Sequence, residues 1–490
     1  MAMPRVPEAL FFLDRSLDRS LQAQIRETVV SAVLDGRMLP GARLPSTRKL
    51  ADYLKISRLT VTLAYQELVG QGYLAATARS GYLVSDAAPN PHLVVPPSPQ
   101  ATNTIDWNKK LVGGLTDRRR IEKPTDWRSF PYPFIYGQMD MGLFHHGAWR
   151  DCARRALGRR DFEDMARDAV AADDPILVNY IASRTLPRRG IAADPNEILV
   201  TVGAQNALWL TIQLLAKRRL HAVCENPGYP DIATALRWYG ARVTPLEVDH
   251  GGLPVEHLPK DADVVFVTPS HHAPTAVTMP ANRRARLLRA AEDQDYVIVE
   301  DDYEFEMSFL KPPSPALKSL DRSGRVIYVG SFSKALFPGL RLGYLVAPEP
   351  FIRQARQLRA LMMRHPPGHQ QRTVAYFLAL GHYDSLTRDL RRAFATRREV
   401  LTEALKKEGL EISGASSFGG TNFWIRGPDG LNSTRFAEAL REDGVLIEPG
   451  APFFDGGEEP IPYFRMAYSS IAAEKIDEGV RRIARRLRRR

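Results

Sequence analysis

The sequence has little cysteine and no long hydrophobic run. Cys152 and Cys224 are its only cysteines, which excludes a framework of several disulfides and agrees with a reducing compartment. No apolar stretch approaches the roughly 20 residues that cross a bilayer, so we expect no membrane-spanning segment. The first residues include acidic side chains and lack a hydrophobic core, which argues against a cleaved secretory signal. Together these absences predict a cytoplasmic protein.

The sequence also lacks internal repeats of solenoid length, and its composition is ordinary. Hydrophobic residues make up 44% and charged residues 25% of its 490 residues, values that are typical of globular proteins. A chain of this length is too long for one core, so two or more domains are expected. The net charge of +11 favours a polyanionic partner only weakly, and DNA binding therefore has to be argued from motifs.

Composition divides the chain into three parts. Residues 10–85 are compact, with helical periodicity and little proline after Pro45. Residues 86–129 begin with "DAAPNPHLVVPPSPQATNT", whose proline, alanine and polar residues favour an extended linker. Residues 130–490 alternate helix-like segments with short apolar runs, among them "NEILVTVGA", "ADVVFVTPS", "DYVIVEDDY" and "RVIYVGSFS". Buried strands that alternate with helices predict an α/β domain with a mostly parallel sheet and helices on both faces.

Three helices and a hairpin are predicted in residues 10–85. Apolar residues recur at helical spacing from Leu21 to Val33, and Gly36 provides a C-terminal stop. Ser46 is predicted to cap the second helix and Ser57 the third. The following "LAATARSGYLV" indicates two short strands around a turn. This arrangement predicts a winged helix-turn-helix.

The third predicted helix carries side chains suited to reading DNA. Residues at the N-terminus of a recognition helix reach base edges in the major groove, and an arginine there can pair bidentately with guanine. Hydroxyl and guanidinium groups nearby suit phosphate oxygens. The predicted DNA-binding residues are Arg43, Ser46, Arg48, Ser57, Arg58, Thr60, Arg79 and Gly81.

The same segment resembles a known DNA-binding domain. "PGARLPSTRKLADYLKISRLTVTLAYQELVGQGYL", with the later "SGYLV", is similar to the GntR-type winged helix over nearly its whole length. The resemblance implies a double-stranded DNA operator as partner. An amphipathic three-helix bundle with solvated charges is the alternative that periodicity alone would allow.

Residues 198–344 contain the groups that a pyridoxal phosphate site requires: an amine, a carboxylate at the ring nitrogen, phosphate donors and a stacking surface. Lys334 in "SFSKALFPGLR" supplies the amine, and Asp301 at the end of an apolar strand supplies the carboxylate. "VTVGAQNALWL" predicts a strand, a glycine turn and a helix whose first backbone N–H groups form an anion site. The further predicted groups are Ala204 and Gln205 at that helix, Ser331, Ser333 and Arg341 for the phosphate, Tyr303 for the ring oxygen and Tyr229 for stacking.

The segment from about Phe130 to the C-terminus resembles the fold-type I aminotransferases. The resemblance implies a main domain of that fold followed by a small C-terminal α+β subdomain. It implies pyridoxal 5'-phosphate as cofactor, with Lys334 as the Schiff-base lysine. It also implies that Arg465 in "YFRMAYSS" binds the carboxylate of an amino-acid ligand through its planar guanidinium. No metal site is expected.

Two stretches depart from the pattern of that family. "TPSHHAPTAVTM" has Ala273 where a residue usually approaches the ring, and Ala276 where a glycine is usual. His271 and His272 in this stretch are either ligand contacts or ordinary loop histidines. "AADDPILVNYIASR" lacks the aromatic residue and the glycine that usually precede this helix. These departures argue against efficient transamination.

A GntR-type head, a tether and an aminotransferase-like body in this order resemble the MocR/GabR family of transcriptional regulators. The resemblance implies a head-to-tail, domain-swapped homodimer that presents two DNA readers to paired half-sites. It also implies a regulator that senses an amino-acid or amine effector through exchange of the Lys334 Schiff base. An active aminotransferase with an accessory DNA-binding domain, and a regulator that senses pyridoxal phosphate itself, are the alternatives. The sequence selects no particular effector or operator.

Overall fold

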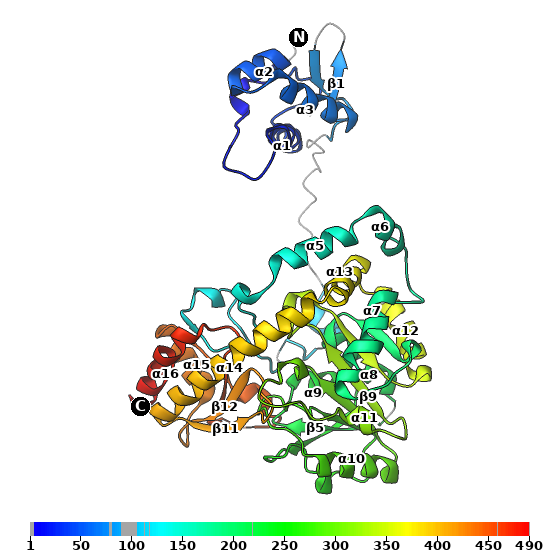
Figure 1. Cartoon of the computed structure of the whole chain (residues 1–490), viewed down its shortest axis with the longest axis vertical. Coiled ribbons are helices and arrows are strands. Elements are labelled where there is room, and N and C mark those ends of the chain that lie inside the picture. The colour runs from blue at the N-terminus through cyan, green and yellow to red at the C-terminus, as the bar shows by residue number, and fades with distance from the viewer. Residues whose placement is uncertain are drawn as a thin grey trace. The chain divides into compact units, whose positions relative to one another are not determined.

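The structure is a computed structural model, and it describes residues 4–489 except 78–80, 90–104, 112, 117, 218 and 458. Contacts within the chain divide it into two compact units, Met1–Gly113 and Gly114–Arg490 (Figure 1). The second unit begins earlier than residue 130, because Trp127 packs with Ile135 and Leu446 in a small buried cluster. The boundaries 10–85, 86–129 and 130–490 remain predictions from composition.

The first unit contains the three helices and the hairpin that the sequence predicts. Strands β1 and β2 pair antiparallel, with Leu74 opposite Val84 and Thr77 opposite Gly81. A short further helix follows the hairpin. The elements are α1 (Leu21–Leu34), α2 (Thr47–Leu54), α3 (Arg58–Gly70), β1 (Leu74–Thr77), β2 (Gly81–Val84) and α4 (Trp107–Lys110).

Local signals in the sequence set the ends of these helices. The hydroxyls of Ser46 and Ser57 accept hydrogen bonds from backbone N–H groups three residues later, so both serines are N-caps as predicted. Helix α1 ends before Gly36, whose φ of 73° suits glycine. The apolar faces meet in one core that includes Ile25, Val29, Leu50, Val61, Tyr65 and Leu68.

A seven-stranded sheet forms the centre of the second unit. Its strand order is β4-β10-β9-β8-β7-β5-β6, and only the pairs that include β10 are antiparallel. The mostly parallel sheet is thus confirmed. The strands are β4 (Ile198–Thr201), β5 (His221–Asn226), β6 (Arg242–Glu247), β7 (Val264–Val267), β8 (Val297–Asp302), β9 (Val326–Ser331) and β10 (Gly343–Val346).

Helices cover both faces of this sheet, as the alternation of buried residues requires. In β8, Ile298 belongs to one buried cluster with Leu287 of α10, and Val299 belongs to another with Leu208 of α8. The α-helices up to the end of the main sheet region are α5 (His146–Ala156), α6 (Arg159–Met165), α7 (Pro175–Tyr180), α8 (Gly203–Leu215), α9 (Pro230–Trp238), α10 (Ala281–Gln294), α11 (Leu317–Leu320), α12 (Glu349–Met363) and α13 (Gly368–Ala379).

A smaller α+β part follows, as expected. Its antiparallel sheet has the order β11-β12-β15-β14, and Figure 1 shows α14 and α16 beside it. A separate short strand, β13, pairs parallel with β3. The elements are β3 (Tyr132–Pro133), α14 (His382–Glu408), β11 (Glu411–Ala415), β12 (Asn422–Arg426), α15 (Ser433–Glu442), β13 (Val445–Leu446), β14 (Glu448–Pro449), β15 (Tyr463–Ala467) and α16 (Ala473–Arg488).

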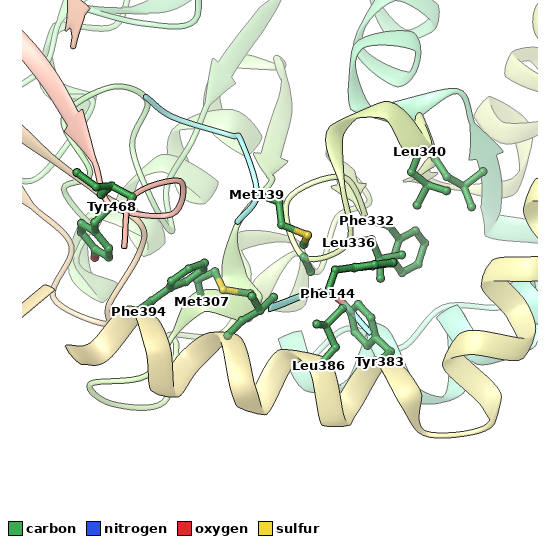
Figure 2. Close-up of a cluster of buried hydrophobic side chains, with 14 of the residues drawn as sticks. Met139, Phe144, Met307, Phe332, Leu336, Leu340, Tyr383, Leu386, Phe394 and Tyr468 are labelled. Atoms are coloured by element: carbon green, nitrogen blue, oxygen red, sulfur yellow. The ribbon is translucent and has the colours of Figure 1, made fainter. Parts of the chain in front are cut away.

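The loop between β9 and β10 is held by a large hydrophobic cluster (Figure 2). Phe332 and Leu336 of this loop are fully buried, and Figure 2 shows them near Tyr383 and Leu386 of α14. The ring centroids of Phe332 and Tyr383 are 6.3 Å apart. Because close packing on both sides fixes these apolar residues, Lys334 between them is held in a rigid loop.

In the part of the chain that the structure describes, every helix is too short or too polar to traverse a lipid bilayer.

Candidate functional site

Lys334 lies inside the second unit, and its amine faces an aromatic ring. Its Nζ is 4.2 Å from the centroid of Tyr136. Burial, and after it the nearby charge of Lys123, lower the pKa of Lys334 to about 7. A large fraction of its amine is therefore neutral near neutral pH, which a nucleophilic lysine requires.

Asp301 lies near the C-terminal end of strand β8 and is buried. In the described residues its Oδ1 has no hydrogen-bond partner. Burial, followed by the charge of neighbouring Asp302, raises the pKa of Asp301 to about 7. A buried carboxylate atom without a partner is costly, so this position suits a cationic N–H group from a ligand.

An anion cradle forms where α8 begins. Gly203 has a φ of 73°, and a Cβ added there would lie 3.1 Å from Nη2 of Arg341. A Cβ added at Gly343 would lie 2.9 Å from the backbone nitrogen of Ala204. The two glycines thus let a guanidinium and the N-terminus of a 13-residue helix come together, and both attract a phosphate group.

Two serines extend this cradle from the end of β9. The Ser331 hydroxyl accepts a hydrogen bond of 3.2 Å from the backbone N–H of Ser333. Both side chains are buried, and the Ser333 hydroxyl has no partner among the described residues. The structure therefore brings Ser331, Ser333 and Arg341 to the same loop as Lys334.

Two tyrosines of the predicted site make protein hydrogen bonds. The Tyr229 hydroxyl donates to Oε1 of Gln205 at 2.8 Å and lies 3.0 Å from Oδ2 of Asp231. The Tyr303 hydroxyl donates to the backbone carbonyl of His271 at 2.7 Å. Stacking by Tyr229 and contact of Tyr303 with the ring oxygen remain predictions.

The two histidines of the departing stretch are buried among protein groups. His271 Nε2 lies 2.9 Å from Glu304 Oε2 and 3.2 Å from the side-chain oxygen of Asn422. His272 Nδ1 lies 2.7 Å from the hydroxyl of Thr275, and burial lowers the pKa of His272 to about 3. These contacts are those of structural histidines, and ligand contact by either one remains a prediction.

The neighbouring Ala276 has a φ of 62°. This is the left-handed region that glycine adopts freely and alanine does not. At the position where the sequence comparison leads us to expect glycine, the loop thus has a backbone conformation that glycine adopts without strain. Ala273 is buried beside it and presents only a methyl group.

Arg465 lies in β15 of the smaller sheet and is buried. Its Nε donates to Oε2 of Glu448 at 2.7 Å. Its guanidinium carbon lies 4.2 Å from the ring centroid of Tyr136, the same ring that Lys334 contacts. Arg465, in β15 of the smaller sheet, and Lys334, in the loop after β9 of the main sheet, therefore contact the same aromatic ring.

Sequence reasoning missed several residues of this site. Tyr136 and Gly137 lie against Lys334, Glu304 lines a small cavity with Lys334, and Lys123 and Glu448 form an ion pair of 3.2 Å. Lys123 lies within the segment that composition indicates as linker, so no local signal pointed to it. Glu304 directly follows Tyr303 and could have been found from its position after β8.

These residues fit pyridoxal phosphate. An unpartnered buried carboxylate oxygen, a half-buried amine of lowered pKa and an anion cradle are three separate features that this cofactor would satisfy together. In the described residues, no group of three or more metal-ligating side chains occurs.

The first unit presents a separate polar surface at the start of α3. Ser46, Arg48, Ser57 and Arg58 are exposed, and Thr60 is half-buried. Arg58 Nε donates to the Thr47 hydroxyl at 3.3 Å, which connects α3 to α2. These side chains lie where a recognition helix would meet DNA, and their individual roles remain predictions.

The wing carries the remaining predicted DNA contacts. Gly81 is exposed at the start of β2 with a φ of 81°. Arg43 is half-buried and bridges to Leu83 of the same strand. The predicted contact of Arg79 lies outside the described residues.

Two family models match the chain. Residues 21–84 match "Bacterial regulatory proteins, gntR family", and residues 173–483 match "Aminotransferase class I and II". The first match coincides with α1 to β2, and the second includes the seven-stranded sheet and the site around Lys334.

Known proteins match most or all of the chain. The HTH-type transcriptional regulator TauR of Rhodobacter capsulatus is 50% identical over 99% of this chain and 100% of its own length. The probable rhizopine catabolism regulatory protein MocR of Rhizobium meliloti is 31% identical over 81% of this chain and 80% of its own. Among solved structures, LysN, the α-aminoadipate aminotransferase of Thermus thermophilus, is 27% identical, with a TM-score of 0.70 over 78% of this chain and 98% of LysN. That structure holds N-(5'-phosphopyridoxyl)-L-leucine.

A GntR-type winged helix followed by a fold-type I aminotransferase unit, together with relatives that match along the whole length, identifies the protein class. The fold of the second unit is that of pyridoxal phosphate-dependent enzymes, and the first unit is that of a DNA-binding regulator. The chain belongs to the MocR-type, GntR-family transcriptional regulators with an aminotransferase class I and II domain.

Proposed function

We propose that this regulator holds pyridoxal 5'-phosphate at Lys334 and senses an amino-acid or amine effector there. The observation that carries the proposal is the half-buried Lys334, with its pKa of about 7 and its amine on the ring of Tyr136, in one site with the unpartnered Oδ1 of Asp301. The same chain carries a GntR-type DNA reader. Ligand binding at Lys334 could therefore change DNA binding by the same chain.

When bound, the cofactor supplies an aldehyde that condenses reversibly with amines. Lys334 is the amine that would hold it, since burial lowers its pKa to about 7 and leaves a large fraction of the amine neutral near neutral pH. Asp301 would accept the hydrogen bond of the ring nitrogen. The phosphate would be bound by Ser331, Ser333, Arg341 and the backbone N–H groups of Ala204 and Gln205.

An effector amine would compete with Lys334, and its acid group would bind Arg465. The guanidinium of Arg465 lies on the ring of Tyr136, as the amine of Lys334 does, so one small molecule could reach both. Such a ligand changes DNA binding only if it binds one conformation of the protein better than another. A difference of about 1.4 kcal/mol between the two binding free energies shifts the balance of conformations ten-fold.

The active form in this proposal is a homodimer. The resemblance to the MocR/GabR family implies two-fold symmetry, which would place two winged helices on paired half-sites. The head-to-tail exchange of winged helices between subunits is part of the same proposal. Size-exclusion chromatography with light scattering measures the mass directly, and a monomer at operator-binding concentrations would contradict it.

A second candidate function is transamination. Lys334, Asp301, Tyr303 and Arg465 are the groups that the reaction uses, and the LysN structure shares the fold. Ala273 and Ala276 argue against efficient turnover, because the loop differs where the family approaches the ring. Formation of a keto acid at a rate of many turnovers per minute would support the enzyme over the sensor.

One experiment separates these functions. The purified chain is loaded with pyridoxal phosphate and titrated with a panel of amino acids and amines while visible absorbance, keto-acid release and operator affinity are followed. A spectral change with altered operator affinity and no keto acid supports the sensor. A response of operator affinity to pyridoxal phosphate alone, with none to any amine, supports a regulator that senses the cofactor itself.

A pair of variants provides the control. Lys334→Ala should remove the visible absorbance of the loaded protein and leave operator binding measurable. Lys407→Met, at an exposed lysine of α14, should leave both unchanged. Unchanged absorbance in Lys334→Ala would exclude Lys334 as the cofactor lysine.

A further inference from the structure

Two oppositely charged residues are direct neighbours on adjacent strands of the smaller sheet. Glu448 in β14 and Arg465 in β15 are paired in register. Nε of Arg465 lies 2.7 Å from Oε2 of Glu448, and the side chains of Arg465 and Glu448 are only 4% and 1% exposed, respectively. Within the described residues, the two terminal nitrogens of Arg465 donate no hydrogen bond to the protein, so that end of its guanidinium is open to a ligand.

Lys123 brings a third charge to this place from the segment ahead of the main sheet. Its Nζ lies 3.2 Å from Oε1 of Glu448 and donates to the backbone carbonyl of Tyr136. A Cβ added at Gly137 would lie 3.8 Å from Nζ of Lys123 and 2.6 Å from Nζ of Lys334. Lys123 therefore borders the same small volume as the cofactor lysine.

The three charges leave one positive charge in excess. The guanidinium of Arg465 and then the ammonium of Lys123 hold the pKa of Glu448 below its usual value against the opposing effect of its burial, so Glu448 is ionised. Arg465 and Glu448 are almost fully buried and Lys123 is partly exposed, so these two cations and one anion are only partly screened by water. Because buried net charge is costly, one added negative charge is favourable here and a second one is not.

We infer that Lys123, Glu448 and Arg465 form an acid-binding subsite that accepts a single monoanionic acid group of the effector and discriminates against dianionic ones. The inference rests on the proposed function, because it assumes an amino compound whose acid end reaches Arg465. The free end of the Arg465 guanidinium binds the acid, and Lys123 adds a second cation. Glu448 fixes Arg465 through Nε and repels a second negative charge.

The test compares acids that differ in charge but share an amine and a carbon chain. Glycine, L-alanine and β-alanine are each paired with the phosphonate analogue, whose second ionisation near neutrality resembles that of a phosphate. Each compound is titrated into the pyridoxal phosphate-loaded full-length protein at pH 8, and the dissociation constant is taken from the visible spectrum. The measured quantity is the ratio of phosphonate to carboxylate dissociation constants within a pair.

Two variants should shift this ratio in opposite directions. Glu448→Gln removes the repelling charge, keeps a hydrogen-bond acceptor and should lower the ratio about ten-fold or more. Lys123→Met removes a cation and should raise the ratio by a similar factor. Glu122→Gln, at an exposed carboxylate in the same segment, and Lys407→Met are the matched controls and should leave the ratio unchanged.

The outcomes separate this inference from the proposed function. If wild-type protein responds to the carboxylates and both site variants keep its ratio within two-fold, the inference is wrong while effector sensing stands. If neither these compounds nor the panel of amino acids and amines titrated above changes the wild-type spectrum, effector sensing fails and the inference fails with it. Lys123 is partly exposed, so Lys123→Met tests the ratio even if Glu448→Gln does not fold.

Discussion

The amine of Lys334 lies 4.2 Å from the ring centroid of Tyr136, and the residue after that tyrosine has no side chain. A Cβ at Gly137 would come within 2.6 Å of Nζ of Lys334, closer than such atoms approach. Gly137 also has a φ of 70°, which glycine adopts without strain. The absence of a side chain at Gly137 thus leaves room for the amine of Lys334.

Gly137→Ala should therefore weaken loading of the protein with pyridoxal phosphate. The new methyl group would displace the amine of Lys334 and constrain its approach to an aldehyde. We expect the apparent affinity for pyridoxal phosphate, measured by visible absorbance, to fall by about ten-fold. Gly240→Ala is the matched control, because Gly240 also has a positive φ of 78° but no atom near its would-be Cβ. Equal losses in both variants would assign the effect to backbone strain alone.

Asp301 should make the cofactor-free protein less stable as the pH rises. Its folded-state pKa of about 7 is above its ordinary value of 3.8, so folding favours the protonated form. That contribution is complete below about pH 4 and is lost as the pH rises through 7. Asp301→Asn should thus raise the free energy of unfolding at pH 8 relative to pH 5, by on the order of 2 kcal/mol.

Thermal or urea unfolding of cofactor-free protein at both pH values measures this difference. Other buried acids, such as Glu225 with a pKa of about 8, keep part of the pH dependence in the variant. Asp429→Asn, at a carboxylate whose side chain is 85% exposed, is the control and should follow the wild type. An identical pH profile in Asp301→Asn and the wild type would show that Asp301 is not buried in this way.

Arg58 should contribute to sequence-specific DNA binding. It is exposed at the first position of α3, where a bidentate contact with a base is worth about 1–3 kcal/mol. Arg58→Ala should weaken binding to an operator selected from random DNA by that amount and weaken non-specific binding much less. Arg37→Ala, at an exposed arginine paired with Asp35, should change neither. Constant operator affinity in Arg58→Ala would place the base contacts elsewhere.

Leu68 should be important for the stability of the first unit. It is fully buried in the core between the helices, and Leu68→Ala should cost about 2–5 kcal/mol. Leu59→Ala, at a leucine that is 65% exposed on the same helix, should cost well under 1 kcal/mol. Calorimetry of the full chain measures both losses of stability. The unfolding transition whose midpoint temperature rises when operator DNA is added is that of the first unit.

Much of the fold was predictable from local signals. The serine caps at Ser46 and Ser57 and the apolar spacing of α1 depend on near neighbours in the sequence, and the structure agrees with each. The strands of the main sheet were visible because burial on both faces requires continuous apolar runs. The carboxylate at Asp301 could be found because it lies near the end of such a strand.

The missed residues depend on contacts between distant segments. Lys123 and Glu448 are 325 positions apart, and Lys123 lies in a polar stretch that resembles linker by composition. Tyr136 is one of many buried aromatics, and only the fold shows that it faces both Lys334 and Arg465. Periodicity and composition carry no information about such pairings, so these residues required the structure.

Lys334 follows a strand of the seven-stranded sheet, whereas Arg465 lies within the four-stranded one. A small molecule held by both residues would tie the two sheets together. Its carbon chain would then act as a spacer, and chain length would determine how far apart the sheets lie. Under the proposed function, compounds of equal affinity but different length would produce different signals, so affinity alone would be a poor guide to the natural effector.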